Sequence, residues 1–439
     1  MTTRTPILLI LTASLIAGVL SALVLSQGIN MNADGWAFWS GAVSLAEGQG
    51  YTHFYGNAPI WEWPPTFSYF IAAWQSVFGV SVRTLIYSTV FLSVLAVLLW
   101  GWFFHRLAEL FTLSDRLRLL FHIATLLFLA AFIPYYYKSL LIDNLRFALL
   151  PLYLHFFMNV VRAETESARW KSASGLILTG MLLAVIHNAN LAFVGAAVVM
   201  LPCIVRPKSN AFVIAAASLV LPVAAWYLVR VLFVLHPGHG FFFRLSFDSI
   251  ALLLPKLLQD TANLLFGETA WKHYGLLLAI GLAIIIAWRI RGQRSGSGSG
   301  KPEKPNPVGV LLIFAGLALL LNTAMCYVVQ LSTVTRYIWF IPLLLVPLLF
   351  LQALRVSPRV LYPMSLAVFL LPALGKIVLL IFFTLTDWGN YVSAKPLEAF
   401  VRSDMFIERE YATGDPQRTE KGVLVSPPLY PWVEKRAVR

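Results

Sequence analysis

The sequence predicts an all-α protein, a polytopic bundle of transmembrane helices. Of its 439 residues, 59% are hydrophobic and only 12% are charged, and the mean hydropathy is +0.76. A soluble domain carries roughly a quarter charged residues. The charges also gather in short runs between apolar stretches of about twenty residues, the length of a helix that crosses a bilayer. A single soluble core is therefore excluded.

We expect eleven spans, each a run of apolar residues bounded by polar ones. They cover residues 6–27, 84–104, 118–137, 144–161, 172–187, 189–205, 211–234, 274–288, 307–329, 337–354 and 360–386.

Segment 64–80 is also apolar, but we interpret it as a juxtamembrane helix on the outer surface. It opens with two prolines and is only about seventeen residues long, short for a span. With this threading the inner loops hold about 16 Lys and Arg, whereas the outer loops, nearly twice as long in total, hold about 7. The bias places the N-terminus in the cytoplasm. The same bias accounts for most of the net charge of +13, because basic inner loops face anionic lipid. The charge therefore does not indicate a nucleic-acid partner.

Composition divides the chain into five parts. Residues 291–307 are rich in Gly, Ser, Pro and Lys, as is typical of a flexible cytoplasmic linker. The expected parts are an N-terminal module (1–210), two spans with a long outer loop at 235–273 (211–290), this linker, a three-span module (308–386) and an extracytoplasmic tail (387–439).

Ionisable residues from separate segments converge on the outer face in this threading. They are Asp34, Glu47, His53 and Glu62 in the first outer loop, Lys138, Asp143 and Arg146 in the second, Arg244 in the long loop and Arg336 in the last; Lys376 lies within the final span. A charge inside a membrane needs a partner or a wet cavity. Convergence on one side predicts a functional site at the membrane surface.

The first outer loop resembles that of the GT-C superfamily of integral-membrane glycosyltransferases, and in particular the mannosyltransferase and aminoarabinose transferase group. The resemblance covers residues 1 to about 210. It departs from the family at His187-Asn188-Ala189-Asn190, where many relatives place a basic or hydroxylic residue between the fifth and sixth spans. The matching segments are Asp34-Gly35-Trp36, Ala42 to Gly48, Gly50-Tyr51, Trp63-Pro64-Pro65 with Tyr69, Leu140 to Asp143, and Thr335-Arg336-Tyr337.

The resemblance implies transfer of a sugar from a polyprenyl-phosphate donor to an acceptor hydroxyl on the outer face, with inversion. A carboxylate can take the proton of the attacking hydroxyl, and Asp34 is the candidate base. A cation can stabilise the charge that develops on the leaving phosphate. Arg336 is the candidate for that role, with Arg244, Lys376 and Lys138 as possible helpers. Substrate contacts are expected from Glu47, Tyr51, His53, Glu62, Trp63, Tyr69 and His187.

Asp143 has several interpretations. It is a second catalytic candidate, it could position the acceptor, or it could bind Mg²⁺ or Mn²⁺ together with Asp34. Its spacing from Arg146 also allows a structural ion pair on one helix face. Asp34 could likewise cap the helix that follows it.

Two other classes of function stay open, a transporter or flippase of lipid-linked glycans and a non-catalytic membrane assembly factor. Charges crowded at the outer face favour the transferase, because transporters place them near the midplane. The expected partners are the polyprenyl-phosphate donor, a glycan, glycolipid or protein acceptor, and membrane lipids. We expect a monomer in the inner or plasma membrane, with its tail extracytoplasmic.

Overall fold

The computed structural model describes most of the N-terminal half of the chain and parts of the remainder. The described residues are 4–25, 29, 33–52, 60, 64–137, 140–205, 207–233, 306–328, 339–356, 375, 378, 417–418 and 424–425. The predicted span 274–288, nearly all of 360–386, the long loop 235–273 and the linker lie outside them. The total of eleven spans and the division into five parts therefore stay predictions.

Helices occupy the other nine predicted spans. Among the described residues, five helices are long and apolar enough to cross a membrane. The chain is thus a multi-pass membrane protein. The nine helices are α1 (Arg4–Leu25), α4 (Val82–Ala108), α5 (Asp115–Tyr136), α6 (Ile142–Arg162), α7 (Glu166–Ile186), α8 (Leu191–Ile204), α9 (Lys208–Phe233), α12 (Pro307–Val328) and α13 (Phe340–Val356). A short antiparallel pair, β1 (Gln417–Arg418) with β2 (Leu424–Val425), is also described.

Polar side chains determine where several of these helices begin. The side chain of Ser81 accepts a hydrogen bond from the Thr84 backbone N–H at the start of α4 (3.2 Å). Thr165 does the same for α7 by accepting from the Ala168 N–H (3.2 Å). Such caps satisfy N–H groups that have no partner within the helix. Inside the bundle, the indole of Trp100 on α4 donates to the Phe147 carbonyl oxygen of α6 (2.9 Å), which fixes one helix against the other.

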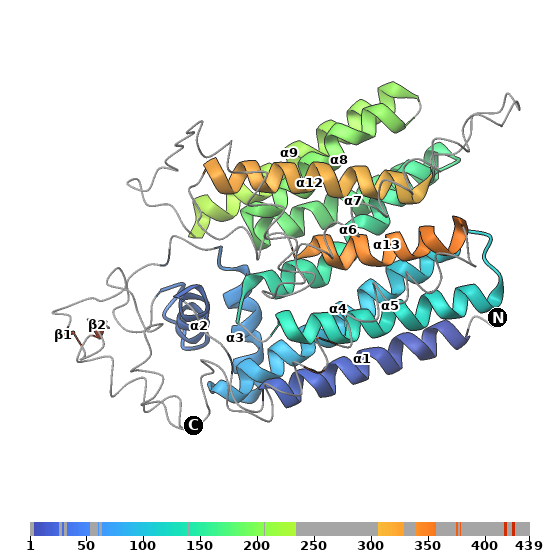
Figure 1. The fold of residues 1–439 in the computed structure, drawn as a ribbon. Helices are drawn as coiled ribbons and strands as arrows, with labels where there is room; N and C mark the ends of the chain where they lie inside the picture. Colours follow the sequence, from blue (N-terminus) through green and yellow to red (C-terminus); the bar gives the residue numbers. More distant parts are fainter. Residues whose placement is uncertain are drawn as a thin grey trace, which may run out of the picture.

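The long helices run side by side, and two shorter ones, α2 (Ala33–Ala46) and α3 (Thr66–Phe78), lie crosswise at one end of the bundle (Figure 1). We call this the α2–α3 end. At 1.5 Å per residue, the thirteen residues of α3 extend about 20 Å, less than the roughly 30 Å hydrocarbon core. The prediction that segment 64–80 forms a helix is confirmed, and its short length is consistent with the predicted juxtamembrane position.

Two hydrogen bonds fix this end layer to its surroundings. Ser68 of α3 donates to the Phe38 carbonyl oxygen of α2 (2.9 Å). Thr66, the first residue of α3, donates to the Val185 carbonyl oxygen near the end of α7 (2.6 Å). The first outer loop is therefore fastened to the long helices, and α3 starts beside the connection between α7 and α8.

Candidate functional site

Asp34 lies in the first turn of α2, directly after the residue at which that helix begins. This turn belongs to the α2–α3 end of the bundle. That this end faces the outer side of the membrane stays a prediction. Its catalytic role stays a prediction.

The loop after α2 is shaped by glycine and tyrosine. Gly48 and Gly50 have φ angles of 75° and 82°, a left-handed backbone that glycine adopts without strain. Tyr51 is only 9% exposed, and its backbone oxygen accepts from the Ile60 N–H (3.3 Å). Its ring lies over Gly41, where a Cβ would come within 2.5 Å of the ring. Tyr51 therefore packs the loop onto α2, a structural role that sequence reasoning did not assign.

Two further residues with predicted substrate roles lie at the surface of this end layer. Glu47, directly after α2, is exposed. Tyr69 on α3 is 45% exposed. Beneath them, Gln75 of α3 contacts α2. When its amide is oriented so that both its oxygen and its nitrogen have partners, the oxygen accepts from the Trp39 indole N–H (2.9 Å). This contact fixes α3 on α2.

A buried ion pair marks the start of α6. The Arg146 guanidinium donates to Asp143 Oδ1 at 2.8 Å, and both side chains are almost completely inaccessible to solvent. The pair follows the i to i+3 spacing, so the structural ion pair predicted as one interpretation of Asp143 is present. Arg146 also lies over the ring of Phe193 on α8, with 5.8 Å from Cζ to the centroid. An aromatic face attracts a desolvated guanidinium, so this ring helps to hold the cation inside the protein.

Tyr137, the residue that ends α5, adds a hydroxyl to this region. It is 2% exposed, and its hydroxyl has no hydrogen-bond partner among the described residues. A phenolic hydroxyl can both donate and accept a hydrogen bond, so it can serve either kind of partner.

The connection between α7 and α8 completes the site. His187 is 8% exposed, and its Nδ1 accepts from the Ala189 N–H (3.0 Å), so the neutral ring carries its proton on Nε2. Asn190 donates from its amide to the Leu183 carbonyl oxygen (2.7 Å), while its Oδ1 has no partner among the described residues. A short 3₁₀ turn, η1 (Asn188–Asn190), thus holds both side chains in a fixed connection next to the N-terminus of α3.

The described candidate residues therefore lie on α6 and α8 and at the ends of α5 and α7, and α3 meets the end of α7 through Thr66. Phe147 and Phe193 both contact Phe340 at the start of α13, which shows that the C-terminal helices also border it. Sequence reasoning missed Tyr137, Asn190 and Phe193. The run of three tyrosines before Lys138 was the available signal for the first of them.

Several predicted site residues lie outside the described residues: Lys138, Arg244, Arg336, Lys376, His53, Glu62 and Trp63. Within the described part of the chain, no group of three or more His, Cys, Asp or Glu side chains could hold a metal ion. A divalent ion between Asp34 and Asp143 stays a prediction.

The fold is similar to that of ArnT from Cupriavidus metallidurans bound to undecaprenyl phosphate, with a TM-score of 0.56 and 16% sequence identity. The match covers 86% of this chain and 64% of that one. A second ArnT structure, in the apo state, matches with a TM-score of 0.41 and 15% identity over 78% of this chain and 76% of that chain. The sequence matches no protein-family profile and no curated protein. The predicted fold class, an all-α bundle of transmembrane helices, is confirmed, and its fold resembles that of this ArnT structure.

Proposed function

We propose that this protein is a membrane glycosyltransferase that moves a sugar from a polyprenyl-phosphate donor to an acceptor hydroxyl. The observation that carries the proposal is the shared fold with a structure bound to undecaprenyl phosphate. The α2–α3 end supports it, because it combines an acidic first outer loop with a buried polar cluster. The chemistry at that end would take place on the extracytoplasmic side in the predicted topology.

The reaction needs one base and one cation. As the acceptor oxygen attacks the anomeric carbon, its proton goes to Asp34, and the bond between that carbon and the phosphate oxygen breaks with inversion. Polyprenyl phosphate is already an acidic leaving group, so it needs a positive partner and no proton donor. Arg336 is our candidate for that partner, with Arg244, Lys376 and Lys138 as helpers.

Asp143 and Arg146 act in this proposal as a unit that shapes the acceptor side. Asp143 accepts from the guanidinium at 2.8 Å. Because both side chains are buried, the pair would support the acceptor side from within the bundle and keep neighbouring groups in place. Glu47, Tyr69 and His187 supply further polar groups at the same end.

The test is release of polyprenyl phosphate from a panel of purified polyprenyl-phosphate sugars, in a membrane extract that supplies the acceptor. Wild-type protein is expected to release it from one donor. Asp34→Asn removes the base while keeping size and polarity, and should lower the rate by about 100-fold or more.

The controls separate the transferase from the other two classes. Asp34→Asn must keep the melting temperature and detergent-solubilised yield of the wild type. A folded, lipid-bound wild-type protein that consumes no donor contradicts the proposal. Transport of an intact lipid-linked glycan in liposomes would then favour a flippase. Equal activity of Asp34→Asn and wild type would exclude Asp34 as the base.

A further inference from the structure

A pocket of about 300 Å³ lies at the opposite end of the bundle, between the last turns of α4 and α6 and the first turns of α7. It has two kinds of lining. Apolar side chains, including Phe103, Leu107 and Met158, form one part. Polar side chains form the other, among them Arg106, Glu109, Asn159 and Arg162. Nothing in the proposed transfer reaction uses this pocket.

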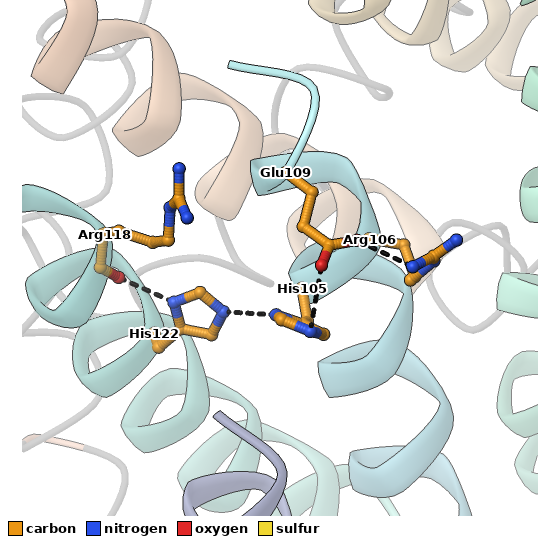
Figure 2. Close-up of polar contacts among 5 residues, drawn as sticks. All are labelled: His105, Arg106, Glu109, Arg118 and His122. Carbon is orange, nitrogen blue, oxygen red and sulfur yellow. Dashed lines mark hydrogen bonds and ion pairs between the residues drawn. The ribbon is translucent and has the colours of Figure 1, made fainter. Parts of the chain in front are cut away.

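A pair of histidines fixes the end of α4 beside it. His105 Nδ1 lies 3.0 Å from His122 Nε2 on α5, and His122 Nδ1 lies 2.6 Å from the Arg118 carbonyl oxygen. Figure 2 shows His105 pointing toward His122, while Arg106 extends to the other side of α4. The histidine contact therefore fixes the rotation of α4 about its axis. This rotation determines the side of the helix from which Arg106 reaches the pocket.

The two arginines of the pocket differ in their partners. Arg106 donates to Glu109 Oε2 at 2.8 Å, so its charge is largely balanced, and its side chain is 54% exposed (Figure 2). Arg162, the last residue of α6, is half-buried and forms no ion pair among the described residues. A cation is favourable at a helix C-terminus, which explains why the position tolerates arginine. The guanidinium therefore offers its donors and its positive charge to the pocket, whose only carboxylate among the described lining residues, that of Glu109, is paired with Arg106.

The depth of the pocket indicates the kind of anion that it fits. His155, another lining residue, lies seven positions before Arg162 on α6, or about 10 Å deeper along the helix. The lining therefore extends from the charged helix ends into the apolar part of the span. A free anion would use only the arginine end, whereas a lipid can place its head group there and its hydrocarbon against Phe103 and Met158.

We propose that this pocket binds the phosphate group of an anionic phospholipid, with Arg162 as its main ligand and Arg106 as a second one. In the predicted topology this end faces the cytoplasm, where anionic lipids concentrate and where basic pockets between membrane helices bind lipid head groups. The site is distinct from the α2–α3 end and does not depend on the transfer reaction.

The experiment is native mass spectrometry of the delipidated full-length protein, titrated with phosphatidylglycerol or with phosphatidylethanolamine of the same acyl chains. Phosphatidylglycerol is expected to bind more tightly. Arg162→Gln should weaken its binding about tenfold, the effect of losing one charge-assisted interaction. The matched control is Arg116→Gln, which removes an exposed charge at the same end of the bundle outside the pocket.

A second variant tests the pocket without changing charge. Ser172 lines it from α7 and is half-buried, so Ser172→Phe should fill the space and also weaken binding. Equal affinity for both lipids, or equal loss in the Arg116→Gln and Arg162→Gln variants, would overturn the proposal in favour of general surface electrostatics. Displacement of the lipid by an equal concentration of inorganic phosphate would instead assign the site to a free anion.

Discussion

At the scale of single residues, the Asp143–Arg146 pair is the most constrained polar feature that the structure describes. Two charges removed from water are stable only when they face each other with good geometry. The 2.8 Å bond and the aromatic ring of Phe193 provide that geometry. A protein that keeps one buried charge without its partner is much less stable than a protein with a well-packed apolar pair of similar size at the same positions.

This asymmetry predicts a result for paired substitutions. Asp143→Leu alone and Arg146→Met alone should each lower the free energy of unfolding by about 3 kcal/mol or more. The double variant should be far closer to wild type, because no uncompensated charge is left. Thermal unfolding in detergent measures this. If the double variant is as unstable as the sum of the single variants, the two charges do not act as a pair.

Tyr137 gives a second prediction at this scale. Tyr137→Phe should be at least as stable as wild type near pH 7, because the hydroxyl that it removes has no described partner. Thermal unfolding in detergent measures this. A clearly lower melting temperature of Tyr137→Phe would contradict it.

At the scale of elements, the position of the first outer loop depends on how closely Tyr51 and Ile60 approach α2. A Cβ at Gly41 would lie 2.5 Å from the Tyr51 ring and 2.9 Å from Ile60, distances that require one of them to move. Gly41→Ala should therefore lower stability by about 1–3 kcal/mol and reduce donor turnover, because the loop that follows Asp34 is displaced.

The matched control for that variant is Gly316→Ala on α12, where a Cβ meets nothing within 4 Å. It should leave turnover unchanged and raise stability slightly, because alanine favours a helix more than glycine does. Melting temperature and polyprenyl phosphate release distinguish the two changes. Equal behaviour of the two variants would show that the loop has room to adjust.

Several of these elements could be predicted from the sequence, because apolar length and charge bias are local properties of the chain. The helix over 64–80 and the ion pair of Asp143 with Arg146 follow from such local patterns. The site could be predicted only in part. Phe193 meets Arg146 across 47 positions, and a contact between distant helices depends on packing that no local pattern records. Tyr51 looked like a sugar-binding aromatic residue, yet its fit against Gly41 becomes visible only in three dimensions.

At the scale of the whole molecule, the bundle has two polar ends of different character. The α2–α3 end carries Asp34 at the start of α2, Glu47 after it and one buried ion pair, whereas the other end carries the His105–His122 contact and several arginines (Figure 2). The Lys and Arg bias predicts that the arginine-rich end faces the cytoplasm. Both proposals depend on this orientation, since the donor reaction and the lipid pocket are assigned to opposite sides.

Cysteine labelling tests the orientation directly. In a background with Cys203→Ala and Cys326→Ala, Gln49→Cys places a thiol in the exposed loop after α2, and Thr112→Cys places one in the exposed connection between α4 and α5. A membrane-impermeant maleimide added to intact spheroplasts should label Gln49→Cys and should reach Thr112→Cys only after the membrane is permeabilised. The reverse pattern would show that the bundle has the opposite orientation in the membrane, with the loop after α2 in the cytoplasm and the arginine pocket at the outer leaflet. Both proposals would then have to be reassigned to the opposite faces, because each side of the membrane offers different lipids and acceptors.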